Sequence, residues 1–251
     1  MKKEKKISVI QSGKFQITVN NETGNISVKD LKGKSVISSI NVYHKVNLPI
    51  IKDLSESIQK YYAGEKHGRG IIGDENYLRI TTDSNKTAQI SLPSLLDVQL
   101  ASDERFYGGG STSRKNIQHR GEILRIWATY QKTEIPMPFL MSSDGWAIFN
   151  NTTALNYFDV GRYEKDRLFI LNTNGDMDFY LILGNSMQEA ISLYTTITGK
   201  PYLLPEWAYG PAFGGNMMED QMGVMNDAVR FRDEKIPCDI YWLEPQWMAK
   251  Y

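Results

Sequence analysis

Residues that could bind or activate a ligand gather near the carboxyl end of the sequence. Asp239 and Glu244 are the two acids in and directly after the apolar run 238–243, and Gln246 and Trp247 follow them. Two carboxylates can share acid–base work only when both reach the same reacting group. Residues five positions apart on a strand face opposite sides of it. Asp239 and Glu244 are therefore not expected to act as a pair.

Three segments must position these side chains. Residues 209–213 form a short apolar run followed by Gly214 and Gly215, residues 219–234 have helical periodicity, and residues 238–243 form a second apolar run between two prolines. A strand, a helix and a strand within about forty residues predict a βαβ unit, whose two strands are parallel.

A single βαβ unit cannot cover its own faces, because parallel strands are buried on both sides in known folds. A (β/α)8 barrel takes about 250 residues, and far fewer follow residue 205. We therefore expect the chain to be the amino-terminal piece of a longer protein. Residues from 211 onward are expected to be poorly ordered, rearranged or packed against a second copy, and the third alternative would be a self-association of the truncated end.

Residues 7–200 have the pattern of a β-sandwich. Apolar and polar residues alternate over short runs, as at Phe15, Ile17 and Val19, and turn signals recur every ten residues or so. Strands are also expected at 77–80 and 88–90, and residues 56–60 form at most one helical turn. The dipeptides Asp144-Gly145 and Asn174-Gly175 predict hairpins. Residues 187–196 predict a helix with Ser186 as its cap, and residues 201–205 form a linker.

The totals describe an ordinary globular protein. Of 251 residues, 41% are hydrophobic and 23% are charged, with 29 basic and 29 acidic side chains. A net charge of zero gives no general attraction to nucleic acid or to anionic lipid, so we expect neither as a partner. No run is long enough to span a membrane. The basic start at 1–6 lacks the apolar stretch of a signal peptide, and Cys238 alone cannot form an intrachain disulfide.

A glycine-rich segment lies at 106–116. It lacks the spacing of a phosphate-binding loop, and no helical pattern follows it. A tight, bulged strand end is the better interpretation, because glycine allows two backbones to approach closely. Arg114, Lys115 and His119 are interpreted as members of a solvated polar loop. We expect no cofactor and no metal ion.

The order of short motifs from Phe106 onward resembles glycoside hydrolase family 31, the family of α-glucosidases and α-xylosidases. The resemblance covers residues 100–251 well and 1–100 only in style. Its motifs are Phe-Tyr-Gly-Gly-Gly at 106–110, Ile-Trp at 126–127, Pro-Phe at 138–139, Gly-Trp-Ala-Ile-Phe at 145–149, Phe-Asp-Val-Gly at 158–161, Asp-Phe-Tyr-Leu-Ile at 178–182, Tyr-Thr-Thr-Ile-Thr-Gly-Lys-Pro at 194–201, Leu-Pro-Glu-Trp-Ala-Tyr-Gly at 204–210 and Ile-Pro-Cys-Asp-Ile-Tyr-Trp-Leu-Glu at 236–244.

The resemblance implies a mainly β protein: a galactose-mutarotase-like antiparallel β-sandwich over 1–200, then a linker and the truncated start of a (β/α)8 barrel over 201–251. It also implies a retaining α-glycosidase that acts on an α-linked sugar. Retention needs a nucleophile and an acid/base about 5–5.5 Å apart. In the family both are aspartates on later barrel strands, so the resemblance implies that this piece alone is inactive.

Four residues are implied to meet the substrate. In the family, acids after the second barrel strand bind the sugar, and Glu244, Gln246 and Trp247 stand at that place here. A sandwich loop in the family usually places an aspartate near the sugar, where this sequence has Tyr130. Both departures make α-glucose specificity doubtful. A structural hydrogen bond by Glu244 and ordinary packing of Trp247 remain open.

Two other functions are compatible with the same residues. One is a non-catalytic carbohydrate-binding sandwich, to which the last fifty residues are an appendage. The other is a structural domain with no ligand contact.

Overall fold

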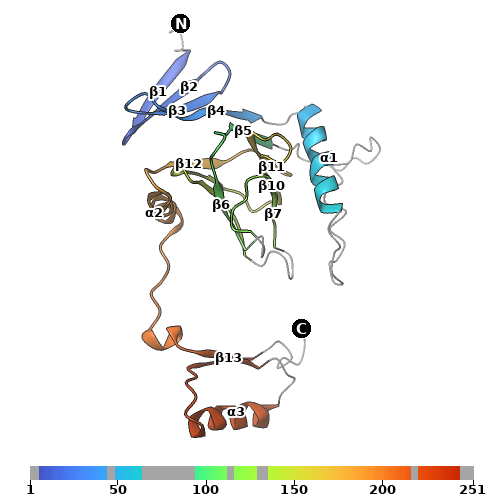
Figure 1. Cartoon of the computed structure of the whole chain (residues 1–251), viewed down its shortest axis with the longest axis vertical. Coiled ribbons are helices and arrows are strands. Elements are labelled where there is room, and N and C mark those ends of the chain that lie inside the picture. The colour runs from blue at the N-terminus through green and yellow to red at the C-terminus, as the bar shows by residue number, and fades with distance from the viewer. Residues whose placement is uncertain are drawn as a thin grey trace. The chain divides into compact units, whose positions relative to one another are not determined.

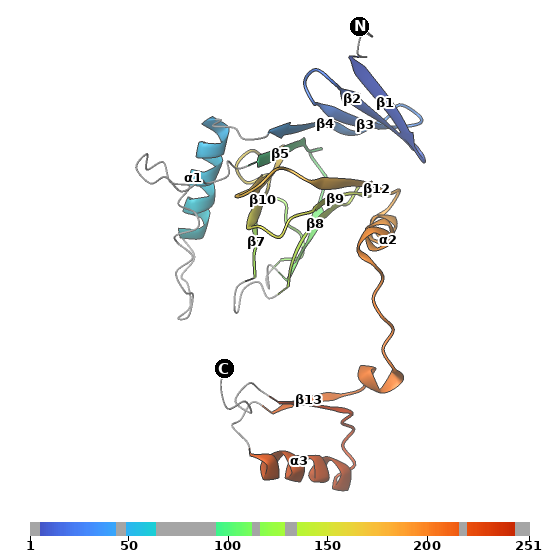
Figure 2. The ribbon, with the colours of Figure 1, turned by 180° about the vertical axis from the view of Figure 1, so that it is seen from behind.

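The chain folds mainly into antiparallel β-sheet (Figures 1 and 2). The structure is a computed structural model that describes residues 6–43, 49–63, 94–111, 116–128, 135–215 and 220–243. The strands expected at 77–80 and 88–90 lie outside the described residues. The chain divides into two compact units, Met1–Thr198 and Gly199–Tyr251, which are taken one at a time below.

Two sheets form the first unit. The larger, sheet A, has eight strands. In spatial order they are β1 (Ile7–Ser12), β2 (Phe15–Asn20), β3 (Ile26–Asp30), β4 (Ser35–Tyr43), β5 (Ser94–Gln99), β11 (Arg167–Asn172), β10 (Asn156–Val160) and β7 (Ile123–Ile126). The smaller, sheet B, has four: β12 (Phe179–Leu183), β9 (Trp146–Asn150), β8 (Pro136–Ser142) and β6 (Phe106–Gly110). All neighbouring strands in both sheets run antiparallel.

The main core lies between the two sheets. Alternate residues of each strand point inward, which matches the two-residue period of the predicted strands. Phe106 and Trp146 of sheet B meet edge to face with ring centroids 5.7 Å apart, and both are buried together with Phe158 of sheet A. The predicted antiparallel sandwich is therefore confirmed.

Sheet A is covered on its outer face as well. The helix α1 (Pro49–Ala63) places Leu54 and Ile58 against Leu95, Tyr157 and Phe169, and both views show it beside the sheet (Figures 1 and 2). Every residue of β10 is consequently buried. The sequence prediction of a single turn at 56–60 was wrong, although Leu54, Ile58 and Tyr61 recur at helical spacing and could have indicated the longer helix.

The outer face of sheet B carries the second helix, α2 (Met187–Thr198). Ala190 is buried there against sheet B, and the Ser186 hydroxyl accepts a hydrogen bond from the amide of Glu189 at 3.2 Å. The helix ends before Gly199, whose φ of 96° closes it. The predicted helix and its cap are confirmed, and the helix runs two residues beyond the predicted end.

Only one of the two predicted hairpins forms. Asp144-Gly145 joins the antiparallel pair β8 and β9 as predicted. Asn174-Gly175 instead carries the chain from β11 in sheet A to β12 in sheet B, so the hairpin prediction was wrong there. The dipeptide does make a turn, with φ of 86° at Gly175. A turn dipeptide determines the local backbone geometry. Which partner each flanking strand pairs with depends on how that strand is buried.

The glycine-rich strand β6 is bulged, as predicted. Gly108, Gly109 and Gly110 all have positive φ, and the pairing with β8 shifts register between Gly108 and Gly110. A methyl group built on Gly108 would overlap the carbonyl oxygen of Phe139. The glycines are needed because the two backbones approach too closely for side chains.

The second unit contains the predicted strand, helix and strand. A 3-10 helix, η2 (Glu206–Tyr209), precedes β13 (Ala212–Gly215), α3 (Gln221–Asp233) and β14 (Ile240–Leu243). The two strands are parallel, with Ala212 opposite Ile240. Asp220 caps α3 by accepting from the amide of Gly223 at 2.8 Å. Among the described residues, no helix has the length and apolar character that crossing a membrane requires.

Substituting Gly110 tests the close approach of β6 to β8. A methyl group there would overlap the Ile135 carbonyl oxygen and lie 2.7 Å from the Met137 amide nitrogen, at φ of 73°. Gly24 has nearly the same φ, 74°, with nothing near the added methyl group. Gly24→Ala is expected to cost about 1 kcal/mol of unfolding free energy from backbone strain alone, and Gly110→Ala about 3 kcal/mol or more. Urea denaturation checks this, and equal costs would contradict it.

Candidate substrate-binding site

The predicted site residues lie just beyond the described strands. Tyr130 falls in 129–134, and Glu244, Gln246 and Trp247 fall in 244–251, so all four are outside the described residues. The structure does describe the elements that lead to them. Strand β7 ends at Ile126, and β14 ends at Leu243.

The carboxyl ends of β13 and β14 lie side by side. Gly215 is opposite Leu243 in the parallel register, and Glu244 follows Leu243 directly in the chain. Folds built from parallel strands bind their ligands at this edge of the sheet. The second unit thus presents an edge where a ligand site would be expected.

The two faces of this strand pair differ. On one face, Phe213 contacts Phe231 of α3 and Tyr241 of β14, with ring centroids 5.0 and 5.3 Å away. The Tyr241 hydroxyl donates to Asp227 at 3.2 Å, which ties β14 to the helix. Alternation along the strand puts Trp242 on the opposite face, where 62% of its surface is exposed.

Asp239 lies at the other end of β14. Its amide donates to the carbonyl of Pro211 at 2.9 Å, and its carboxylate occupies the space that a side chain on residue 210 would take. Asp239 therefore belongs to the amino-terminal edge of the pair, which in such folds serves stability. This placement agrees with the expectation that Asp239 and Glu244 do not form a catalytic pair.

In the first unit, the strand before Tyr130 ends at an exposed tryptophan. Ile123, Leu124 and Ile126 of β7 are buried, whereas Trp127 is exposed directly after them. Strand β7 is the last strand of sheet A on that side and pairs with β10. The chain thus leaves the core at Trp127, three residues before the predicted contact.

Glu104 is a buried carboxylate that joins three segments. It accepts hydrogen bonds from the Ser142 hydroxyl and the Trp146 indole, each at 2.5 Å, and from the Ala101 amide at 3.1 Å. Burial raises the pKa of Glu104, and the hydrogen bonds from Ser142 and the Ala101 amide limit the rise. Because all three donors are protein groups of the sandwich, we assign Glu104 to stability.

Asp159 plays a similar part in the Phe-Asp-Val-Gly motif. Its carboxylate accepts from the backbone amides of Arg162 and Tyr163, at 2.7 and 3.1 Å, and so fixes the turn after β10. Burial raises the pKa of Asp159 to about 6, against the lowering effect of these two hydrogen bonds. This part of the family resemblance is therefore structural.

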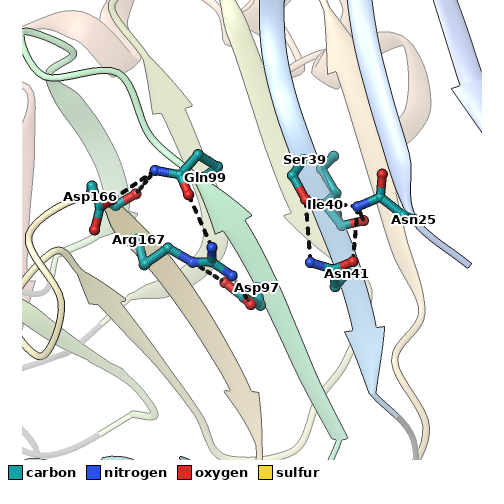
Figure 3. Close-up of polar contacts among 8 residues, drawn as sticks. All are labelled: Asn25, Ser39, Ile40, Asn41, Asp97, Gln99, Asp166 and Arg167. Atoms are coloured by element: carbon teal, nitrogen blue, oxygen red, sulfur yellow. Dashed lines mark hydrogen bonds and ion pairs between the residues drawn. The ribbon is translucent and has the colours of Figure 1, made fainter. Parts of the chain in front are cut away.

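On the outer face of sheet A, polar side chains form two groups whose members hydrogen-bond to one another (Figure 3). Arg167 forms a two-pronged ion pair with Asp97 and donates to Gln99 at 3.0 Å, and Gln99 donates to Asp166 at 2.9 Å. A second group of Asn25, Ser39 and Asn41 is linked by its own hydrogen bonds. The first group joins β5 to β11, and the second joins the turn before β3 to β4.

The interpretation of His119 as a solvated residue was wrong. Only 3% of its surface is exposed, and its ring nitrogens lie 3.0 Å from Glu122 and 3.2 Å from the carbonyl oxygen of Gly108. The contact with Gly108 fastens the segment before β7 to the glycine-rich strand. Arg114 and Lys115 lie outside the described residues.

Sequence reasoning missed Glu104 and Asp159 as buried acids. For Asp159 a signal was present, since the residue sits between Phe158 and Val160 in a strand with no other charge. An acid inside an apolar strand must find hydrogen-bond donors.

Within the described part of the chain, no group of three or more histidine, cysteine or acidic side chains could hold a metal ion.

Solved structures share this fold. The dextranase of Flavobacterium johnsoniae, solved with glucose bound, matches with a TM-score of 0.70 and 24% identity over 98% of this chain and 26% of its own. The cycloalternan-forming enzyme of Listeria monocytogenes, solved with a pentasaccharide substrate, matches with a TM-score of 0.63 and 18% identity over 95% of this chain and 21% of its own. These likenesses show that the chain shares the fold of these two structures.

Sequence comparison then gives the family. Residues 1–159 match the glycosyl hydrolase 31 N-terminal galactose mutarotase-like domain, so the chain belongs to that family. An isomaltosyltransferase of Sporosarcina globispora is 31% identical over 155 residues, 57% of this chain and 14% of its own length. An alpha-xylosidase of Saccharolobus solfataricus is 29% identical over 164 residues, 62% of this chain and 22% of its own. The chain thus spans less than a quarter of these relatives.

Asp159→Asn tests the buried carboxylate. Between the ordinary pKa of 3.8 and the raised value of about 6, the folded state binds more protons than the unfolded state, so stability falls as pH rises. The shift corresponds to about 3 kcal/mol, which the neutral amide does not lose. Because the unfolded carboxyl is already more than half ionised at pH 4, the unfolding free energy of Asp159→Asn relative to the parent should rise by about 2 kcal/mol from pH 4 to pH 7.

Asp166→Asn is the matched control. A hydrogen bond from Gln99 lowers the pKa of Asp166. The contribution of this carboxylate to stability is therefore present above its ordinary pKa of 3.8 and is lost as the pH falls below that value. The difference in unfolding free energy between Asp166→Asn and the parent should stay nearly constant from pH 4 to pH 7. A constant difference for Asp159→Asn as well, measured by urea denaturation across this range, would contradict the assignment.

Proposed function

We propose that the chain is the amino-terminal part of a retaining α-glycosidase that hydrolyses O-glycosyl bonds. Residues 1–200 would form the sandwich domain that shapes the substrate cleft. Residues 201–251 would form the linker and the first βαβ unit of a (β/α)8 catalytic domain. The substrate would be an α-linked sugar, of the kind that α-glucosidases and α-xylosidases cleave.

One observation carries this proposal. A sandwich of the glycosyl hydrolase 31 family is followed, in the same chain, by two parallel strands that a helix connects. The likeness to the dextranase structure extends over 98% of the chain and so includes the second unit. A parallel pair connected by a helix is the repeating element of a (β/α)8 barrel.

Four of the six described acids of the second unit have structural partners. Asp220 caps α3, Asp227 accepts from Tyr241, Glu234 pairs with Arg230 at 3.3 Å, and Asp239 lies against Gly210. None of these stands in a pair at the carboxyl ends of the strands, where hydrolysis would need it. This supports placing the nucleophile and the acid/base on barrel strands that this chain does not contain.

The 251-residue chain is accordingly expected to be inactive on 4-nitrophenyl α-glucoside and α-xyloside, measured by nitrophenol release. A protein extended through the downstream coding sequence should hydrolyse at least one of them with retention of configuration, followed by NMR of the first-formed anomer. Turnover by the purified 251-residue chain would overturn the placement of the catalytic aspartates.

Within this proposal, the four sequence-predicted residues bind the substrate. Glu244 and Gln246 would follow the second barrel strand, where polar groups reach the sugar hydroxyls. The neutral amide of Gln246 can donate as well as accept, which would change the hydroxyl pattern that is recognised. Trp247 and Tyr130 would supply aromatic faces against the sugar ring.

In the extended protein, Tyr130→Ala and Gln246→Ala are each expected to lower kcat/KM about tenfold or more, because each removes a substrate contact worth about 1–2 kcal/mol. The matched control is Leu31→Ala, which changes an exposed residue in the turn before β4. Unchanged kinetics in both test variants would favour a purely structural sandwich.

A non-catalytic carbohydrate-binding module is the alternative. It is distinguished by titrating the 251-residue chain with α-linked oligosaccharides, combined with the activity assay on the extended protein. Tight sugar binding without activity in the extended protein would favour the module.

A further inference from the structure

The outer face of sheet B carries a row of aromatic side chains that ends at an open edge. Phe139 of β8 is opposite Phe149 of β9, and Phe149 is opposite Tyr180 of β12. Among the described residues, β12 is the terminal strand of sheet B, and no described strand pairs with its other edge. Tyr180 is 42% exposed, whereas Phe139 is buried.

The aromatic row is rigid. Phe149 and Tyr180 lie nearly parallel, with an interplanar angle of 17° and centroids 5.8 Å apart. Tyr194 of α2 stacks on Phe139 at 4.2 Å and meets the edge of Phe149 at 5.3 Å. Tyr180 is thus held by Phe149 on one side of its ring. A side chain that is already held loses little conformational entropy when a ligand stacks on it.

Two polar side chains stand next to Tyr180 on the same face. Asn151 and Asp178 extend the pairing of β9 and β12 by one residue pair, since the Asn151 amide donates to the Asp178 carbonyl at 2.8 Å. Their side chains also meet, with Asn151 Nδ2 donating to Asp178 Oδ2 at 2.7 Å. Residues 178 and 180 are two positions apart, which places the carboxylate about 7 Å along the strand from the aromatic ring.

An aromatic ring beside a fixed amide–carboxylate pair has the chemistry to hold a sugar. The C–H groups on one face of a pyranose stack on an aromatic face, and the hydroxyls around its rim hydrogen-bond to planar polar groups. Asp178 and Asn151 are both exposed, and Asp178 keeps a second carboxylate oxygen that can accept from a hydroxyl. A negatively charged ligand would be disfavoured here, because the Asp178 carboxylate carries a charge of the same sign.

We propose that Tyr180, Asn151 and Asp178 form a surface subsite for one pyranose unit of a neutral oligosaccharide. Tyr180 provides the stacking surface, and the Asn151–Asp178 pair orients the hydroxyls. The choice of an α-linked sugar as ligand rests on the proposed function. The subsite itself is built only from residues of the first unit.

The test is a titration of the 251-residue chain with isomaltotriose, followed by 1H–15N NMR. Resonances of Asn151, Asp178 and Tyr180 are expected to shift with a Kd of about 1–10 mM. Tyr180→Ala should weaken binding about tenfold or more. Asp178→Ala should weaken it about fivefold. Tyr180→Phe keeps the ring and should stay within about twofold of the parent.

Two controls make the result specific. Tyr202→Ala removes another tyrosine, which is 84% exposed in the linker, and should bind as the parent does. Glycerol has hydroxyls but no ring to stack, so it should not produce the same shifts. The proposal is overturned if isomaltotriose shifts none of the three resonances at about 50 mM, if folded Tyr180→Ala binds like the parent, or if glycerol reproduces the shifts.

Failure here and failure of the proposed function can be told apart. The subsite is judged by binding to the 251-residue chain, whatever the extended protein does. The proposed function is judged by hydrolysis in the extended protein, whatever happens at Tyr180.

Discussion

The central strands β5, β10 and β11 of sheet A are buried on both faces, and the architecture of the first unit depends on this constraint. The inner face of sheet A meets sheet B around Trp146 and Phe158, and its outer face meets α1 through Leu54 and Ile58. A strand covered on both sides has no solvent-facing positions, so β10 is buried along its whole length. Any polar side chain on such a strand must find its partners within the protein.

The buried acids show how that requirement is met. Asp97 is held by Arg167, Asp159 by two backbone amides, and Glu104 by a hydroxyl, an indole and an amide. An unpaired polar group in such surroundings would cost several kcal/mol. These contacts stabilise the scaffold, and the ligand contact proposed above falls instead on an exposed side chain at a sheet edge, Tyr180.

Local patterns predicted most strands, the capped helix α2 and the parallel unit, because the hydrophobic period, the helix caps and the turn residues each depend on a few adjacent positions. They failed where tertiary contacts decide. Asn174-Gly175 turns the chain between two sheets, and His119 is buried against the backbone of Gly108 in the glycine-rich strand. The four predicted site residues lie outside the described residues, so their prediction rests on family resemblance.

The position of α1 between β4 and β5 in the chain shows where members of this family can differ in length. Strands β4 and β5 are neighbours in sheet A, yet residues 44–93 separate them in the chain, and α1 is part of that excursion. Closing a flexible loop twice as long costs only about 0.6 kcal/mol more. The β4–β5 connection is therefore a place where evolution could lengthen or exchange a whole segment at small thermodynamic cost, while the sandwich keeps its strand order.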